Sequence, residues 1–203
     1  SFLIPAPPAP VPMPQASAEP ESFAAPVVGQ SPVSSEARLT NSEPASGAID
    51  ARAPTAAGWQ EVALEFYGSV AEKTAADFEI LSESSDQPVI ASVVHDAEKK
   101  NRLTINFDRP LPAGYGTTIK TRWGGGEVCL GSLPGDVNGD RQVTAADQDA
   151  LFNTLNGEDT LLRPVYSIDI DGSGSVVAQD LIKLIDLFNT GWLGKELVGC
   201  AQG

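Results

Sequence analysis

The middle of the chain alternates between apolar and polar residues, which is the pattern of strands that bury one face. The alternation is clearest at Val62, Leu64 and Phe66. Strands are predicted at residues 62–66, 78–80, 89–94, 103–107 and 115–121, with a sixth at 127–130. Residues 56–130 are therefore expected to form an all-β domain.

The last third of the chain changes to the period of a helix. The apolar positions of two predicted helices are Leu151, Phe152 and Leu155, and then Leu181, Leu184, Ile185 and Phe188. In the second helix they fall at i, i+3, i+4 and i+7, so they share one helix face. Asn156-Gly157 and Thr190-Gly191 are expected to end the two helices.

Each predicted helix follows a twelve-residue loop with oxygen-bearing residues at positions 1, 3, 5 and 12 and a valine at position 8. This is the spacing of an EF-hand loop, which turns alternate side chains inward onto one hard cation. Asp, Asn, Gly and Ser also mark ordinary turns, but two such loops favour two Ca²⁺ sites. The candidate ligands are Asp136, Asn138, Asp140, Gln142 (through its carbonyl), Thr144 and Asp147 in loop 1, and Asp169, Asp171, Ser173, Ser175 (through its carbonyl) and Asp180 in loop 2.

The loops differ from standard EF-hands at several positions. Position 12 is Asp in both loops, where the standard residue is Glu. Position 6 is Gly174 in loop 2 but Arg141 in loop 1, so Arg141 must adopt a backbone conformation that is unusual for a side chain with a Cβ. Position 9 is Val177 in loop 2, where a water is expected to replace the side-chain ligand.

A duplicated loop followed by a helix, with Asp at position 12, resembles the type I dockerin module. Residues 135–140 (GDVNGD) and 169–174 (DIDGSG) are close to its signature, and the resemblance covers about residues 133–192. It implies a calcium-folded, non-catalytic module that docks onto cohesin domains of extracellular bacterial scaffolds.

The residues that carry partner specificity in that family depart from its best-known members. At loop positions 10 and 11 this chain has Ala145-Ala146 in loop 1 and Ala178-Gln179 in loop 2. At a later pair of helical positions it has Phe152-Asn153 in the first repeat and Ile185-Asp186 in the second. The best-known cellulosomal members have Ser-Thr at positions 10 and 11. The resemblance therefore implies the fold of the module but not an ordinary cellulosomal cohesin as its partner.

The order of strands and turns between residues 62 and 114 resembles the Ig-like modules of bacterial surface and S-layer proteins. Such a sandwich usually has about seven strands in about 100 residues, and the sequence pattern predicts fewer. Either the N-terminal region supplies a strand, or one sheet edge remains open to another segment.

Residues 1–55 are expected to form an extended, proline-rich segment. Eleven of the sixteen prolines lie before residue 55, mixed with Ala, Ser and Glu, which is typical of a spacer. The segment also carries apolar residues that would suit pockets or an open sheet edge on a neighbouring subunit, in cis or in trans. They are Phe2, Leu3, Ile4, Val11, Met13, Phe23, Val27 and Val28.

Charge and hydropathy exclude some partners. The chain has 13 basic and 27 acidic residues, a net charge of −14, which argues against nucleic acid and anionic membrane surfaces. No apolar run approaches the ~20 residues of a membrane span, so no membrane insertion is expected. The chain starts at Ser1, as a mature exported protein would after signal cleavage, although a cloning boundary gives the same start.

The two cysteines, Cys129 and Cys200, bracket the predicted calcium module. In an exported protein they could form a disulfide that joins the two ends of the module. Closing a loop of this length would contribute roughly 4 kcal/mol in the chain-entropy model. Two free buried thiols are the alternative.

The sequence has few candidates for catalysis, and we expect no enzyme activity. His95 is the only histidine and follows a β-branched stretch, where a strand-end role is more common than that of a base. No nucleophile elbow, phosphate-binding glycine loop or zinc spacing is present. Trp59, Trp123 and Trp192 would suggest a carbohydrate-binding platform if exposed, but core or interface anchors are the commoner role.

Together these features predict a multi-domain, secreted bacterial cell-surface protein. It would consist of an extended segment (1–55), an Ig-like β-sandwich (56–130) and a dockerin-like module with two Ca²⁺ ions (131–203). The predicted function is structural: extracellular protein–protein assembly, in which copies of the chain polymerise into a filament or surface layer. The alternative is the targeting part of an enzyme or adhesin that binds a separate cohesin scaffold.

Overall fold

The computed structural model describes residues 37–56, 58–158 and 163–200. The predicted extended segment lies outside the described residues as far as residue 36, and so do all its proposed apolar anchors. The described residues belong to one compact unit of the chain.

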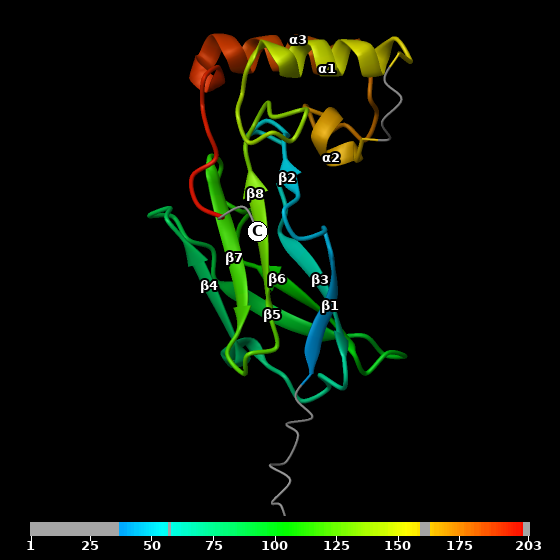
Figure 1. The fold of residues 1–203 in the computed structure, drawn as a ribbon, viewed down its shortest axis with the longest axis vertical. Helices are drawn as coiled ribbons and strands as arrows, with labels where there is room; N and C mark the ends of the chain where they lie inside the picture. The colour runs from blue at the N-terminus through cyan, green and yellow to red at the C-terminus, as the bar shows by residue number, and fades with distance from the viewer. Residues whose placement is uncertain (1–36, 57, 159–162, 201–203) are drawn as a thin grey trace, which may run out of the picture. The chain divides into compact units, whose positions relative to one another are not determined.

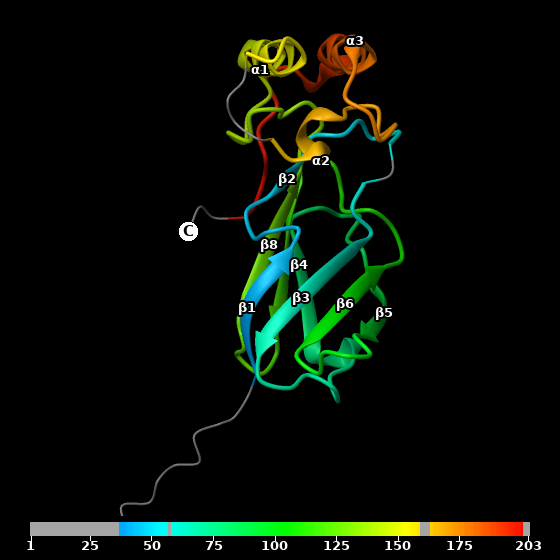
Figure 2. The same ribbon diagram turned by 90° about the vertical axis from the view of Figure 1, so that its right-hand side faces the viewer.

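Within the described residues, eight strands form two four-stranded sheets (Figures 1 and 2). In the first sheet the spatial order is β1 (Arg38–Glu43), β3 (Glu61–Tyr67), β6 (Arg102–Phe107) and β5 (Ile90–His95). In the second it is β2 (Ile49–Asp50), β8 (Glu127–Ser132), β7 (Tyr115–Thr121) and β4 (Phe78–Ser82). All neighbours are antiparallel except β2, which runs parallel to β8.

The two sheets share one hydrophobic core, as expected for a β-sandwich. Val62, Leu64 and Phe66 of β3 point into it, and Ile119 and Leu130 reach it from the opposite sheet. Alternate residues of β3 are exposed or half-buried, so the period-two pattern in the sequence marks the two faces of the strand.

Two strands, β1 and β2, lie within residues 1–55, for which the sequence analysis predicts an extended segment and places no strand. β1 pairs with β3, and β2 pairs with β8. Of the six residues of β1 only Ser42 is buried, because β1 is an edge strand with little contact to the core. A strand of this kind has no apolar alternation for sequence analysis to detect, and its pairing with β3 decides its conformation.

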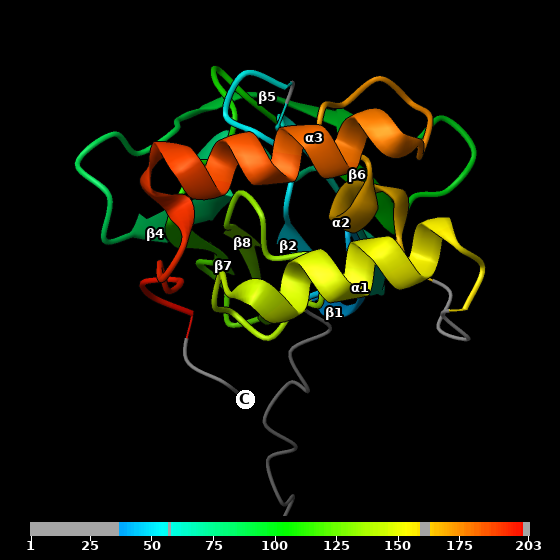
Figure 3. The same cartoon turned by 90° about the horizontal axis from the view of Figure 1, so that it is seen from above.

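The C-terminal part contains α1 (Ala145–Leu155), α2 (Val165–Ile168) and α3 (Ala178–Leu187). α1 and α3 lie side by side (Figure 3). The first helix ends at Leu155 with Asn156 as its cap, as predicted, while the second passes into a π-helical turn, Phe188–Trp192. A short 3₁₀ turn, Ala75–Asp77, precedes β4. In the described residues no helix is long and apolar enough to span a bilayer.

The helical part has a second hydrophobic core. Val137 and Leu151 of the first repeat pack there with Ile170 and Leu184 of the second. Phe188 and Trp192 of the π-helical turn extend this core toward a small third cluster around Leu133 and Val143.

Candidate metal centre

In loop 1 the carboxylate of Asp136 is completely buried and oriented by backbone amides. Its Oδ1 accepts hydrogen bonds from the amides of Gly139 (2.8 Å) and Asp140 (3.1 Å). Its Oδ2 accepts one from the amide of Arg141 (2.9 Å). These bonds wrap the loop around the Asp136 carboxylate and turn the following residues toward the same point.

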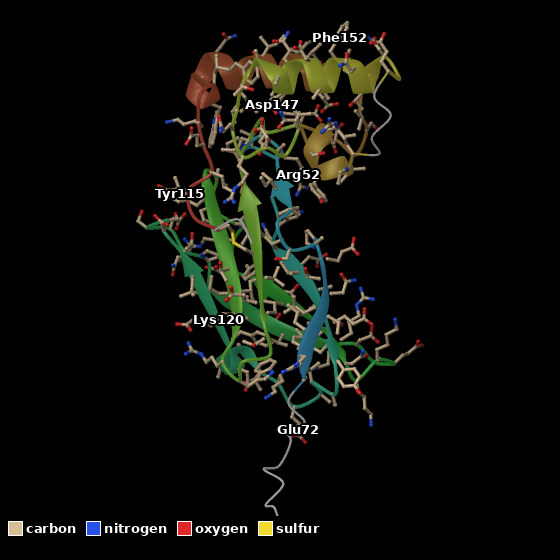
Figure 4. The ribbon with its side chains drawn as sticks, viewed as in Figure 1. Arg52, Glu72, Tyr115, Lys120, Asp147 and Phe152 are labelled. Carbon is tan, nitrogen blue, oxygen red and sulfur yellow. A yellow bond between two sulfur atoms is a disulfide. The ribbon has the colours of Figure 1, made fainter. Side chains whose placement is uncertain are left out.

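Asp147, at position 12, connects loop 1 to helix α1 (Figure 4). It is also completely buried. Its carboxylate accepts hydrogen bonds from the amides of Asn138 (3.0 Å) and Thr144 (2.7 Å). Thr144 is the N-cap of α1, and its hydroxyl accepts from the amide of Ala146. The capping box thus holds the last predicted ligand of the loop at the start of the helix.

The remaining predicted ligands of loop 1 are more exposed. The side-chain oxygen of Asn138 accepts from the amide of Asp140 at 2.8 Å, and its Nδ2 donates to Asp140 Oδ2 at 3.0 Å. Asp140 Oδ1 accepts from the amide of Gln142 at 2.9 Å. Position 5 is therefore held in place by both position 3 and position 7 of the loop.

Loop 2 repeats the backbone arrangement of loop 1. Asp169 accepts from the amides of Ser173 (3.0 Å) and Gly174 (2.8 Å), as Asp136 does at the equivalent positions. Asp180 accepts from the amides of Asp171 (3.2 Å) and Val177 (2.8 Å), as Asp147 does. The two loops therefore share one hydrogen-bonding plan even though their sequences differ at most positions.

Three carboxylates converge in loop 2. One oxygen from each of Asp169, Asp171 and Asp180 lies within 4.8 Å of the others. Ser173 lies among them: its hydroxyl is 3.5 Å from Asp169 Oδ1 and donates to the carbonyl of Ser175 at 3.2 Å. All five residues predicted for this loop are thus brought together, and the acidic cluster can hold a metal ion.

The electrostatics of loop 1 also fit a cation. Burial, together with the smaller effect of the nearby Asp147 charge, raises the pKa of Asp136 to about 7. Burial likewise raises the pKa of Asp147. The ion pairs within the described part of the chain involve other carboxylates. A hard divalent cation would compensate this negative charge, and an oxygen-only ligand set matches Ca²⁺.

Position 6 has the predicted backbone conformation in both loops, with φ of 75° at Arg141 and 83° at Gly174. Sequence analysis did not predict the role of the Arg141 side chain. Its guanidinium donates hydrogen bonds to the carbonyls of Gly199 and Cys200. This contact attaches loop 1 to the C-terminal end of the described chain.

Residues 194–200 run alongside loop 1. The amide of Val143 donates to the carbonyl of Lys195, and the amide of Leu197 donates to the carbonyl of Arg141. The sulfur atoms of Cys129 and Cys200 lie within disulfide-bonding distance, with their Cα atoms 5.8 Å apart. The segment is therefore tied to loop 1 at one end and to strand β8 at the other.

The β-sandwich contributes residues to the core of the module, which the sequence did not indicate. Ala51 and Ala53, just after β2, are buried there. Arg52, labelled in Figure 4, lies between them and forms an ion pair with Asp50. The hydrogen bond to Asp50 raises the pKa of Arg52, with a smaller contribution from Asp169 of loop 2. A positive charge from the sandwich segment thus acts on the second loop.

Helices α1 and α3 also expose apolar side chains. Phe152 of α1 and Ile182 and Ile185 of α3 are exposed. Figure 4 places Phe152 on the side of α1 that faces away from Asp147 and the loop. The module thus combines a buried acidic interior with an apolar helical surface.

Residues 134–189 match the family model described as the dockerin type I domain, and the match includes both loops. Comparison with curated proteins finds no match. Similar solved structures include an L,D-transpeptidase from Mycobacterium smegmatis (15% identity, TM-score 0.33) and L,D-transpeptidase 3 from Mycobacterium tuberculosis (12% identity, TM-score 0.31). Each alignment covers 48% of this chain, but only 40% and 38% of those enzymes. At these TM-scores the similarity carries no argument about fold or activity.

Proposed function

We propose that the C-terminal part of this protein is a calcium-dependent, non-catalytic docking module that binds a cohesin-type domain of another protein. The observation that carries the proposal is the shared plan of the two loops, in which backbone amides orient a buried Asp at position 1 and another at position 12. The match of residues 134–189 to the dockerin type I domain supports the same function.

Two Ca²⁺ ions would be bound, one in each loop. When bound, each ion would compensate the negative charge of the buried carboxylates in its loop. Side chains of Asp136, Asn138, Asp140, Thr144 and Asp147 with the carbonyl of Gln142 would hold the first ion. Asp169, Asp171, Ser173 and Asp180 with the carbonyl of Ser175 would hold the second. Because the position-12 ligands also cap α1 and α3, ion binding would order both helices.

The partner would bind the exposed face of α1 and α3. Phe152, Ile182 and Ile185 are the apolar contacts available on these helices. The two helices differ at matching positions, since Phe152-Asn153 stands where the second repeat has Ile185-Asp186. A partner that distinguishes Phe from Ile would therefore bind in one preferred orientation.

The β-sandwich fits an Ig-like domain. The strand order of the first sheet, β1-β3-β6-β5, agrees with the Ig sheet ABED. In the second sheet the order β8-β7-β4 agrees with GFC, and β2 would be an additional strand that follows β1 in the chain and pairs with β8. We therefore propose an Ig-like domain packed directly on a docking module, in a protein exported to the bacterial cell surface. Polymerisation of copies of the chain is the competing hypothesis. In that hypothesis the N-terminal segment or the docking module of one copy binds the β-sandwich of the next, and the proposed N-terminal anchors lie outside the described residues.

Native mass spectrometry with and without a calcium chelator tests the ion count, and a binding assay against a panel of cohesin domains tests the partner. We expect two bound ions, a monomeric protein and calcium-dependent binding to at least one cohesin. Asp136→Ala and Asp169→Ala should each abolish an ion site, lower the melting temperature and prevent binding. Asp149→Ala, an exposed carboxylate of α1 outside the loops, is the matched control. Calcium-dependent polymers without cohesin binding would favour self-assembly instead.

A further inference from the structure

A groove made of three adjoining hollows lies along the outer face of the first sheet, away from the two candidate metal-binding loops. A hollow of about 420 Å³ is lined by Glu43, Trp59, Glu61, Ala63, Arg102 and Tyr166, among others. A smaller hollow of about 90 Å³ shares Glu43, Ala63 and Arg102 with it. A third, of about 460 Å³, shares Trp59 and Glu61. The hollows therefore adjoin in turn, and together they make up the groove.

The register of the sheet explains the groove. Ala63 points outward at the centre of β3, since its neighbours Val62 and Leu64 are buried in the core. It pairs with Glu43 of β1 on one side and with Thr104 of β6 on the other. A small side chain between two longer ones leaves a depression on the sheet, and Ala63 forms its floor.

An aromatic pair lines the 420 Å³ hollow, which is the middle one of the three. The rings of Trp59 and Tyr166 lie edge to face, with centroids 4.9 Å apart at 72°. Trp59 precedes β3, whereas Tyr166 belongs to α2 of the calcium module, which Figure 2 shows above this sheet. Both residues are half-buried and line the same hollow, so a ligand in that hollow would contact them.

The polar side chains of the groove have unused hydrogen-bonding capacity. Those of Glu43, Glu61 and Arg102 make no hydrogen bond or ion pair with any residue in the described ranges. Glu43 lies close enough to Tyr166 to contribute, after burial, to the raised pKa of that phenol. The groove thus offers carboxylate acceptors, guanidinium donors and aromatic rings together.

This combination decides which ligand chemistry fits best. A cationic peptide would suit Glu43 and Glu61, but it would meet the charge of Arg102 in the same hollow. A neutral sugar presents hydroxyl groups that both donate and accept, and its C–H faces pack on aromatic rings. The adjoining hollows also suit a chain of several sugar units better than a compact ligand.

We propose that this groove binds a neutral polysaccharide chain, with a sugar ring packed against Trp59 and Tyr166 and its hydroxyl groups bonded to Glu61, Glu43 and Arg102. This site is distinct from the docking face of α1 and α3. A protein with both sites would hold a polysaccharide through its β-sandwich while it binds a protein partner through its helices.

Affinity electrophoresis of the full chain, with calcium present, in gels containing hydroxyethylcellulose, xylan, galactomannan or amylose tests the proposal. We expect at least one polymer to retard the protein. Ala63→Gln, which fills the floor without touching the core, should weaken binding about tenfold, and Trp59→Ala should do so at least as strongly. Because Trp59 also contacts the core, its variant needs a melting curve, whereas Ala63→Gln tests the groove without that complication.

Tyr67→Ala is the matched control, because Tyr67 is an aromatic residue at the end of the same strand, 80% exposed and outside the groove. It should leave binding unchanged. Retardation by none of the four polymers, or equal retardation of the wild type and Ala63→Gln, would overturn the proposal. Binding of a lysine-rich peptide that is lost in Glu43→Gln with Glu61→Gln, without polysaccharide binding, would overturn it in favour of a cation-binding groove. None of these variants alters a loop ligand, so calcium and cohesin binding provide independent readouts.

Discussion

The backbone amide of Ala53 donates a hydrogen bond of 2.8 Å to the carbonyl of Ile170, the second residue of loop 2. Two residues earlier, the amide of Ala51 donates to the carbonyl of Tyr166, and the carbonyl of Ala51 accepts from the amide of Gly135. A short segment that leaves strand β2 therefore bonds to the chain next to both loops. The sandwich and the C-terminal helical part share backbone hydrogen bonds as well as a hydrophobic core.

Because of this shared segment, we expect the sandwich and the module to unfold together. Ala53→Leu would overfill the space around a side chain that is only 2% exposed, at a cost of about 1–3 kcal/mol. Calorimetry in calcium should show one transition, shifted to lower temperature in the variant. Ala45→Leu, at an exposed turn position, should have little effect. Two separate transitions, with only the lower one shifted, would contradict the coupling.

Arg141→Gly separates two effects at position 6 of loop 1. Glycine accepts the positive φ of 75° more readily, which favours the loop by up to about 1 kcal/mol. The change also removes the guanidinium bonds to the carbonyls of Gly199 and Cys200. We expect calcium binding to persist while amide hydrogen exchange increases at residues 194–200. Unchanged exchange in this segment would show that the guanidinium does not hold it.

A disulfide between Cys129 and Cys200 is predicted to stabilise the C-terminal module by linking its two ends. Cys129 and Cys200 are 71 residues apart in sequence, and a disulfide closing such a loop contributes about 4 kcal/mol in the chain-entropy model. The double variant Cys129→Ser with Cys200→Ser should lose stability of that order in urea unfolding. Reduction of the wild type should have the same effect. Two thiols titrating in the native protein without reductant would refute the disulfide.

The raised pKa of Asp136 predicts how the stability of the ion-free protein depends on pH. Its folded-state pKa is raised to about 7, chiefly by burial, whereas an unfolded Asp titrates near pH 3.9. Between these values the folded state binds a proton that the unfolded state does not. The stability of the calcium-free protein should therefore fall as the pH rises from about 4 to about 7.

Calcium should reverse this trend, because the ion replaces the proton at Asp136. We expect calcium affinity to weaken as the pH falls through 7, and melting curves of calcium-stripped and calcium-loaded protein between pH 5 and 8 measure both effects. Asp136→Asn should flatten the pH dependence of the stripped protein. A stripped protein whose stability rises with pH over this range would contradict the assignment.

The sequence by itself identified the features that depend on local spacing. The candidate ligands of each loop lie within twelve residues, and short-range bonds such as the one from the Thr144 amide to Asp147 fix their arrangement, so a linear pattern is enough to predict them. The alternation in β3 likewise marked the strand before its partners were known, because a strand with one buried face must place apolar residues at every second position.

Only the tertiary structure decided what depends on distant contacts. β1 has no apolar alternation, Ala51 and Ala53 resemble any alanines in a polar segment, and nothing near Arg141 indicates that its side chain reaches Cys200. The groove over Ala63 arises from strands β1, β3 and β6 and from Tyr166 of the calcium module. Such features exist only once segments far apart in the chain have packed together. That packing depends on side-chain shape and strand pairing between distant segments, which a short stretch of sequence does not predict.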